Sequence, residues 1–509
     1  MSPVEEDDPG RVAVDAELVL PRRIAHWAAA DADRPFLVEV AGRTRSYGEV
    51  LDGVQRWITL LRSCGVGPGD RVASFVPASI DAHLVWLASA SMGALEVSVN
   101  PELRGPLLDH VLGDARPRLC VVRATQRELV PAGAPVIVSD DDPAAGVEPA
   151  TVTGWPAPAD PSCVLYTSGT TGPAKGVIVP WGQLNATIGR IPRRALSPDD
   201  AVYAPWPMFH VTGRSPLPGM ADVGGRVVLR ERLSIAEFWH DVTAHRCTST
   251  TVGAVASLLV DTEAPPAHPV RWMFMAARGE LSLRIQERFG VEVIGNYGST
   301  EIGFPILNRS IRPDTAHLAG WPRPGYETRV VADGVDVPDG AAGELWIKGP
   351  VRAVMFSGYL GFDDDPLVDG WYRTGDLVVR RPDGAIVFVD RLRDVIRRFG
   401  ENISSVAVEN VVIADPEVDV CAALASPSPV CGEEVLLVVA PVAGVDLDPA
   451  ALFGRLTGVL PRYALPAYVA VRPHLPLTPT GKVAKHHLRV SSDDAGVWES
   501  PAAASRHVP

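Results

Sequence analysis

CVLYTSGTTGPAKGVIVP, residues 163–180, consists of an apolar run, a polar loop rich in glycine, and a second apolar run. We expect CVLYT to form a strand, SGTTGPAKG a loop, and VIVP the return strand. Glycines allow successive backbone N–H groups to converge on an anion, while the hydroxyls add donors and Lys175 adds charge. The loop is not the Walker pattern, in which Lys directly follows the second Gly. The expected ligand is therefore a phosphate group, with a flexible hairpin loop as the alternative.

Length, composition and charge limit the possible functions. The chain has 509 residues, 46% of them apolar, so we expect at least two domains. Six cysteines without a CxxC pair argue against zinc and disulfides, and favour a reducing cytoplasm. We expect neither a signal peptide nor a membrane span, because no run approaches the roughly 20 apolar residues that a span needs. A net charge of −14 disfavours nucleic-acid binding but allows a small nucleotide in a local site.

Helical and strand-like periodicities alternate over residues 46–122 and again over 234–298. Ser46 and Glu49 resemble a capping box and precede apolar residues at helical spacing. Such alternation predicts a parallel sheet covered by helices. Residues 126–161 read as a surface connection, and from about 320 short strands alternate with Gly and Pro turns. The expected fold class is α/β, with a large N-terminal domain of helix-covered sheets, a β-rich subdomain and a small C-terminal α+β domain.

Further motifs follow the loop in order along the chain: NYGSTEIG (296–303), WYRTGDL (371–377), DRLRDVIRRFGENISSVAVE (390–409) and LPLTPTGKVAK (475–485). Together they resemble the motifs of the adenylate-forming superfamily, which includes acyl-CoA synthetases, luciferases and the adenylation domains of peptide synthetases. The finer likeness is to the crotonobetaine/carnitine-CoA ligase branch, and it rests on GENISSVAVE (400–409), NPELRG (100–105) and PMFHVTG (207–213).

The resemblance implies a two-step ligase. A small carboxylic acid attacks the α-phosphate of ATP with release of pyrophosphate, and the acyl group then passes to the thiol of CoA. The implied cofactors are ATP, Mg²⁺ and coenzyme A. Because two anions must meet, catalysis rests on neutralising charge and aligning the reactants. The implied ATP- and AMP-binding residues are Thr167, Ser168, Gly169, Thr170, Thr171, Gly172, Lys175, Asn296, Tyr297, Gly298, Ser299, Thr300, Asp376 and Arg391.

Individual roles follow from the same resemblance. Glu301 would be the Mg²⁺ ligand, since Mg²⁺ commonly takes one or two carboxylates and fills its shell with phosphate oxygens and water. Thr300 would reach the α-phosphate, and Tyr297 would stack on adenine. Asp376 would accept both ribose hydroxyls, with Arg391 beside the ribose and phosphate. The alternatives are a strand that ends in a polar turn at YGSTE and an ordinary turn residue at Asp376.

Lys482 is the expected adenylation lysine and would contact both the incoming carboxylate and the phosphate. Its ordinary pKa of about 10.4 leaves it charged. A solvated Lys in a Pro- and Gly-rich loop is the alternative, and Lys485 competes for the role, although its position suggests a supporting one. Thr300, Glu301 and His210 complete the expected catalytic set.

The acyl pocket is the least defined part of the expected site. His210 stands where many relatives place an aromatic residue between acyl group and ATP, with a structural His as the alternative. Two positions depart from the family pattern: Ala277-Arg278-Gly279 replaces Gly-Ala-Pro, and Gly253 replaces a Pro. Arg278 could bind a substrate carboxyl, a CoA phosphate or nothing. The expected pocket residues are His210, Val211, Gly213, Val252, Gly253, Ala276, Ala277, Arg278, Gly298, Ile302 and Gly303, whose small side chains permit a bulky acid.

The expected domains are 1–392 and a mobile lid at 393–489, with a frayed tail at 490–509. The resemblance implies that the lid rotates between the two steps, because Lys482 occupies space that pantetheine needs. The hinge would be Arg393, where Asp or Lys is more usual in the family. Gly400, Glu401 and Asn402 would then turn toward the thioester-forming site.

Three other functions are weighed against the ligase. A stand-alone adenylating enzyme could load an acyl carrier protein in trans, although PMFHVTG lacks the Asp that amino-acid-activating members use. A non-catalytic ATP-binding protein is disfavoured by the joint presence of Lys175, Glu301, Asp376, Arg391 and Lys482. Nothing marks the oxygen site of a luciferase. The expected assembly is a monomer or a homodimer.

Overall fold

The computed structural model describes residues 12, 14–130, 133–140, 142–152, 154–167, 174–276, 279–398, 401–428, 431–478 and 482–501. By packing, the chain divides into two compact units, residues 1–328 with 347–372 and residues 329–346 with 373–509. The boundary expected near 392 concerns a hinge, and it stays a prediction. Among the described helices, none is both long and apolar enough to cross a membrane.

The first sheet of the larger unit holds the two ends of the glycine-rich loop. β7 (Pro161–Thr167) and β8 (Lys175–Pro180) pair antiparallel, with Thr167 opposite Lys175, as the sequence predicts. Its other strands are β3 (Arg71–Ser74), β4 (Leu95–Ser98), β5 (Leu119–Val122), β6 (Val136–Val138) and β19 (Gly358–Tyr359). β3 to β7 run parallel and β8 and β19 close one edge. The two strands that flank the phosphate-loop candidate therefore belong to a sheet of the expected α/β kind.

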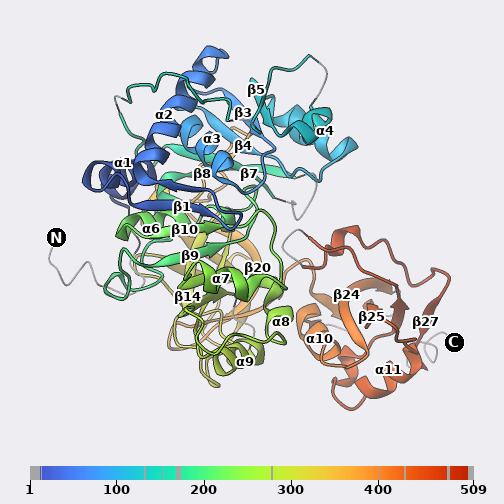
Figure 1. Cartoon of the computed structure of the whole chain (residues 1–509). Helices are drawn as coiled ribbons and strands as arrows, with labels where there is room; N and C mark the ends of the chain where they lie inside the picture. Colours follow the sequence, from blue (N-terminus) through green and yellow to red (C-terminus); the bar gives the residue numbers. More distant parts are fainter. Residues whose placement is uncertain are drawn as a thin grey trace. The chain divides into compact units, whose positions relative to one another are not determined.

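Helices accompany these strands, and those within residues 46–122 lie in the region of predicted helix–strand alternation (Figure 1). They are α1 (Leu20–Ala30), α2 (Tyr47–Ser63), α3 (Ile80–Ser91) and α4 (Gly105–Ala115). The predicted capping box at the start of α2 is confirmed, because the Ser46 hydroxyl accepts from the Glu49 N–H while the Glu49 carboxylate accepts from the Ser46 N–H. α3 is buried on nearly all sides, consistent with its almost continuous apolar sequence.

The second sheet of this unit has nine strands, six of them parallel. The parallel strands are β1 (Pro35–Glu39), β9 (Ala201–Ala204), β10 (Arg226–Leu229), β11 (Ser249–Thr251), β12 (Trp272–Met275) and β13 (Glu292–Ser299). The edges are antiparallel: β14 (Gly303–Asn308) with β15 (Trp321–Pro322), and β2 (Thr44–Ser46). The helices that follow in sequence are α5 (Trp181–Asn185), α6 (Pro216–Val223), α7 (Phe238–Ala244), α8 (Ala256–Leu259) and α9 (Glu280–Phe289).

The two faces of the nine-stranded sheet are covered differently. On one face, Phe238, Leu259 and Ile285 from α7, α8 and α9 pack with Tyr203 and Met273 of the strands into an apolar core. On the other face a smaller cluster joins Ile191 to Trp272, Phe274 and Ile294. Ile191 and Phe274 of this second cluster also line the cavity described below.

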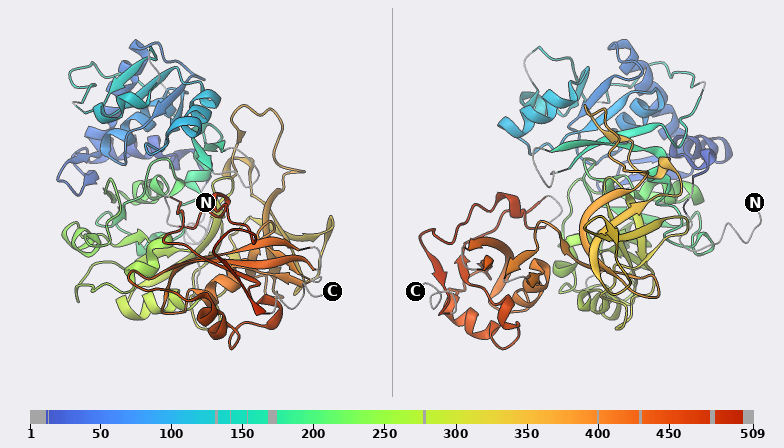
Figure 2. Two further views of the ribbon diagram at one scale, coloured as in Figure 1. Left: turned by 90° about the vertical axis from the view of Figure 1, so that its right-hand side faces the viewer. Right: turned by 180° about the vertical axis from the view of Figure 1, so that it is seen from behind.

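The smaller unit contains a five-stranded and a six-stranded sheet. The five-stranded sheet comprises β16 (Glu327–Ala332), β17 (Val335–Asp336), β18 (Ala342–Lys348), β20 (Tyr372–Arg380) and β21 (Ile386–Arg391), and the unit boundary crosses three of these strands. The six-stranded sheet comprises β22 (Ile396–Arg398), β23 (Glu401–Ile403), β24 (Val418–Ser428), β25 (Gly432–Pro441), β26 (Tyr468–Val471) and β27 (Val497–Glu499). α10 (Ser405–Val412) and α11 (Pro449–Leu456) pack on one face of it (Figure 1 and Figure 2).

Two expectations about these regions need correction. The tail expected at 490–509 is not frayed at 497–499, because β27 pairs with β26 and Trp498 packs against Phe453 with ring centroids 5.4 Å apart. The surface connection expected at 126–161 contributes the short strand β6, which pairs in parallel with β5. Both strands are only three residues long, and long-range pairing rather than local pattern defines them.

All six cysteines are free thiols. Cys64 is exposed, whereas Cys120, Cys163, Cys247, Cys421 and Cys431 are buried. Burial raises the pKa of Cys120 to about 11 and the pKa of Cys421 to about 12, so these thiols stay protonated at neutral pH.

Candidate active site

Lys175 begins β8, immediately after the glycine-rich loop, and its ammonium lies against two aromatic rings. Its Nζ atom is 5.1 Å from the ring centroid of Tyr359 and 5.5 Å from that of Phe362. Tyr359 reaches this place because β19 pairs with β8, which sets Tyr359 opposite Val177. Cation–π contacts of this kind fix a Lys head group without neutralising its charge. Ser168, Gly169, Thr170, Thr171 and Gly172 lie outside the described residues.

Glu301 follows β13 in a tight turn and is held by two hydroxyls. The Ser299 hydroxyl donates to Oε2 at 2.7 Å, and the Tyr359 hydroxyl donates to Oε1 at 3.4 Å. Burial first, and then the charge of Glu301, raise the pKa of Tyr359 to about 12, so its hydroxyl remains a donor. Gly298 allows the close turn, because a Cβ there would lie 1.8 Å from the Gly303 carbonyl oxygen. Tyr359 thus connects Lys175 with Glu301, two residues that the sequence assigns to phosphate and Mg²⁺.

The neighbouring residues of this motif are also placed by contacts that the sequence does not reveal. Thr300 is buried, and its carbonyl accepts a 2.6 Å hydrogen bond from Gln183 Nε2 of α5. Asn296 Oδ1 is buried without a hydrogen-bond partner among the described residues, so it is suited to accept from a ligand N–H such as the amino group of adenine. Tyr297 is half-buried on the same strand.

Asp376 and Arg391 lie opposite each other on the hairpin β20–β21. Asp376 is 3% exposed, and its Oδ1 is 2.8 Å from Arg391 Nε. Arg391 Nη1 also donates to the Thr374 carbonyl at 3.2 Å. The two expected ribose contacts therefore form one ion pair, in which the arginine fixes the orientation of the carboxylate.

The two C-terminal lysines have different surroundings. Lys482 is exposed, and its backbone exchanges hydrogen bonds with Thr478 in a short turn. Lys485 is half-buried and its Nζ contacts Ser405 Oγ at 2.6 Å and Glu409 Oε1 at 2.7 Å. Because Lys485 already has a carboxylate partner, its contacts fit the supporting role expected for it, and the catalytic role of Lys482 stays a prediction. Arg393 Nε is 3.4 Å from Asp394 Oδ1. β23 contains Glu401 and Asn402, whereas Gly400 lies outside the described residues.

The expected acyl-pocket residues come together at one edge of the nine-stranded sheet. They follow the carboxyl ends of β9, β11, β12 and β13, which are neighbours in the order β13-β12-β11-β9. Ligands of α/β sheets commonly bind at this edge. The described members are His210, Val211, Gly213, Val252, Gly253, Ala276, Gly298, Ile302 and Gly303, while Ala277 and Arg278 lie outside the described residues.

Two of these residues show why their types suit the site. His210 precedes a single 3₁₀ turn (Val211–Gly213), and its Nδ1 accepts from the Thr212 N–H at 3.2 Å and lies 2.7 Å from the Thr212 hydroxyl oxygen. Gly213 permits this turn, because a Cβ there would lie 2.3 Å from the Pro207 carbonyl oxygen.

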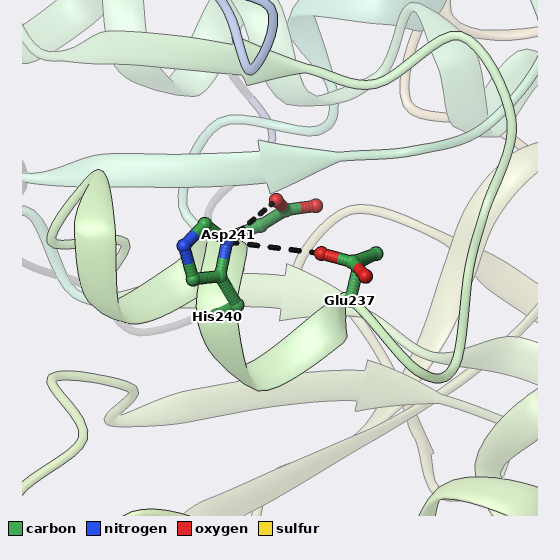
Figure 3. A group of neighbouring side chains, drawn as sticks. All are labelled: Glu237, His240 and Asp241. Carbon is green, nitrogen blue, oxygen red and sulfur yellow. Dashed lines mark ion pairs between the residues drawn. The ribbon is translucent and has the colours of Figure 1, made fainter.

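A separate cluster of potential metal ligands lies on α7 and just before it (Figure 3). His240 Nδ1 is 3.8 Å from Glu237 Oε2 and 3.7 Å from Asp241 Oδ1. Asp241, however, already accepts from the Tyr203 hydroxyl at 2.7 Å and from Arg230. These bonds account for the buried carboxylate, so the cluster is explained by side-chain pairing.

The comparisons with known proteins agree with this geometry. The AMP-binding enzyme family model matches residues 24–360, and the model of the AMP-binding enzyme C-terminal domain matches residues 407–482. The chain belongs to the AMP-binding enzyme family. The resemblance and the α/β fold class expected from the sequence are confirmed.

Relatives over nearly the whole chain are CoA ligases. The chain is 30% identical to sulfoacetate–CoA ligase of Cupriavidus necator, over 90% of this chain and 95% of that one. It is 27% identical to crotonobetaine/carnitine–CoA ligase of Proteus mirabilis, over 88% and 93%. It superposes with a TM-score of 0.82 on ATP-bound MatB from Rhodopseudomonas palustris, at 25% identity over 93% and 98%. The chain is accordingly an ATP-dependent acyl-CoA ligase that uses ATP, Mg²⁺ and CoA.

Proposed function

We propose that the residues described above divide the work of a two-step acid–thiol ligation. In the first step the larger unit would bind ATP and the acid, with Lys175 balancing phosphate charge and Glu301 oriented by Ser299 and Tyr359. Mg²⁺, when bound, would neutralise phosphate oxygens, and Glu301 would be its protein ligand. The observation that supports this division is the contact chain from Lys175 through Tyr359 to Glu301, because it ties the expected phosphate and metal residues together.

The smaller unit would supply the remaining groups. The Asp376 carboxylate, oriented by Arg391, would accept the ribose hydroxyls, and Lys482 would bring positive charge to the carboxylate that attacks the α-phosphate. After pyrophosphate leaves, we propose that residues 393–489 rotate about Arg393. Glu401 and Asn402, with Gly400, would then face the site where the CoA thiol attacks the acyl carbonyl.

The acid would lie at the carboxyl edge of the nine-stranded sheet, between His210, Val252 and Ile302. The relatives do not select one acid, because sulfoacetate carries a second negative charge and carnitine a positive one. The charge of the pocket itself must therefore determine which acid this ligase activates. We propose a monomer or homodimer that works in the cytoplasm, where free thiols such as those of this chain persist.

The decisive experiment is a panel of carboxylic acids assayed for pyrophosphate release with ATP and Mg²⁺, each with and without CoA. We expect at least one acid to give an acyl-CoA product only when CoA is present. Pyrophosphate release without any thioester would instead indicate an acyl carrier protein as the acceptor. Equal turnover by the Glu301→Ala variant would remove Glu301 from the proposed metal site.

A further inference from the structure

A cavity of about 500 Å³ lies on the face of the nine-stranded sheet that carries Ile191 and Phe274. Its floor includes Val202, Ser249 and Phe274 of the strands, and residues 187–193, Leu196 and helix α6 form its walls. The N-terminal residues around η1 (Ala16–Leu18) contribute its outer rim. The volume is in the range of small-molecule sites.

Arg190 is the unusual lining residue. It is 7% exposed, and its guanidinium carbon lies 4.4 Å from the ring centroid of Phe274 and 5.0 Å from that of Phe304. Its Nε donates to the Thr187 carbonyl at 3.2 Å. Among the described residues, no carboxylate lies within ion-pair distance of Arg190, and no hydrogen bond is formed by its two terminal nitrogens.

The carboxylates that line the cavity already have other partners. Asp222 is 3.2 Å from Arg193 Nε, and Glu17 is 2.8 Å from Arg22 Nη1. Asp15 accepts from the Glu17 N–H at 2.9 Å. None of them balances the charge of Arg190.

A neighbouring arginine shows how this protein satisfies a buried guanidinium without a carboxylate. Arg323 is 2% exposed, but it donates to the main-chain carbonyls of Ala186, Phe304 and Ile188. Arg190 lacks such a set of carbonyls. Burial first, and then the charge of Arg323, lower the pKa of Arg190 to about 9, so it remains charged at pH 7. A buried charge without a partner is costly, and a bound anion would remove that cost.

The cavity and the proposed acyl site lie along the same strands of the nine-stranded sheet, β11 and β12. Of the two aromatic rings that contact Arg190, Phe304 follows Gly303 of the expected acyl pocket, and Phe274 stands two residues before Ala276. Ser249 pairs with Trp272, four residues before Ala276. Four residues at about 3.3 Å each place Ser249, and with it the far part of the cavity, about 13 Å from the carboxyl edge of the sheet. An acid activated at that edge could reach it only with a long body.

We propose that Arg190 binds the far end of the substrate, and that the ligase activates an acid with an extended apolar body and a second carboxylate at its distal end. This inference rests on the proposed function, because it places the first carboxylate at the adenylation site. Apolar lining residues such as Leu18, Ile191 and Met220 suit the body of such an acid, and the guanidinium suits a carboxylate.

The test compares dodecanedioic acid with dodecanoic acid as substrates in CoA-dependent pyrophosphate release. We expect kcat/KM of the wild type to favour the diacid at least tenfold, and Arg190→Gln to reduce that preference at least tenfold. Arg194→Gln is the matched control, because Arg194 is an exposed arginine in the same segment that does not line the cavity, and it should keep the preference.

Direct binding separates this proposal from the ligase activity itself. Calorimetric titration of dodecanedioate into the ATP-free protein should show tighter binding to wild type than to Arg190→Gln. If Arg190→Gln does not fold, Arg190→Lys retains the charge and should keep part of the preference. Thioester formation without a diacid preference, or a preference that survives Arg190→Gln, would overturn the role of Arg190 but not the ligase. Absence of turnover with every acid of the broader panel would contradict the proposed function instead.

Discussion

Tyr359 contacts Lys175, the expected phosphate residue, with its ring, and Glu301, the expected Mg²⁺ ligand, with its hydroxyl. Tyr359→Phe keeps the ring beneath Lys175 but removes the donor to Glu301. One such hydrogen bond contributes about 1 kcal/mol, which corresponds to about a fivefold effect. We therefore expect the Mg²⁺ concentration for half-maximal pyrophosphate release to rise about fivefold.

The matched control for this variant is Phe362→Leu, because Phe362 also contacts Lys175 and has no hydroxyl. A titration of Mg²⁺ against initial rate distinguishes the two variants. An equal shift in both would mean that the aromatic rings, and not the hydroxyl, set the metal dependence.

The two C-terminal lysines give a second comparison at the scale of single residues. Lys482→Ala should slow adenylation about 10²–10³-fold while sparing thioester formation from preformed acyl adenylate. Lys485→Ala should instead lower the free energy of unfolding by about 1–3 kcal/mol, because it leaves Glu409 without its cation.

Half-reaction assays and urea unfolding measure these two effects separately. Similar slowing of both half-reactions by Lys482→Ala would contradict its assignment to the first step. A Lys485→Ala protein of unchanged stability but poor adenylation would exchange the roles of the two lysines.

Residues with a motif around them could be predicted from the sequence, and residues defined by contacts could not. Glu301 and Asp376 stand in ordered motifs, and their neighbours give each a chemical context. Tyr359 and Gln183 have no such pattern. Tyr359 reaches Glu301 only because β19 pairs with β8, and Gln183 reaches Thr300 across more than a hundred residues of sequence. Such long-range contacts leave no local signal.

Helix α3 contains a buried His83, and we expect its ring to contribute to the pH dependence of stability. Burial is the main cause that lowers the pKa of His83 to about 4, and the Ser79 carbonyl lies 2.7 Å from Nδ1. An unfolded chain binds the proton near the ordinary value of about 6.5. The folded state therefore binds fewer protons between these values, and stability should fall as the pH decreases from about 6.5 toward 4.

The expected size of this loss is on the order of 3 kcal/mol at pH 4, from the difference between the two pKa values. Urea unfolding of the wild type and of His83→Gln at pH 7 and pH 4 measures it. We expect the variant to be less stable at pH 7 but to lose less stability on acidification. Parallel losses in both proteins would assign the pH dependence to other groups.

Elements with strong periodicity follow the sequence closely, whereas short or packed elements do not. The capping box and the apolar spacing predict α2, and α3 occupies the predicted stretch. α7 begins at Phe238, later than the start of the second alternating stretch at residue 234. β27 lies in a stretch whose composition resembles a tail, and it exists because β26 offers an unpaired edge and Phe453 a surface for Trp498.

The proposed rotation of residues 393–489 is tested at the scale of the whole molecule. Arg393→Pro should spare adenylation and suppress thioester formation, because proline restricts φ to about −65° at the hinge. Arg393→Lys restores a residue that is common in the family and should support both steps. Rapid-quench measurement of acyl adenylate and acyl-CoA follows the two steps in one experiment. Normal overall turnover by Arg393→Pro would show that the chain does not turn at this position.

The distribution of the free thiols makes that rotation accessible to spectroscopy. Cys64, in α2's C-terminal turn, is exposed, and the other five thiols are buried. A maleimide dye should therefore modify the native enzyme at one place in the larger unit. A second cysteine, introduced on the exposed side of α11, would accept a partner dye. Energy transfer between the two fluorophores could then follow a single molecule through successive turnovers, without removal of any native residue.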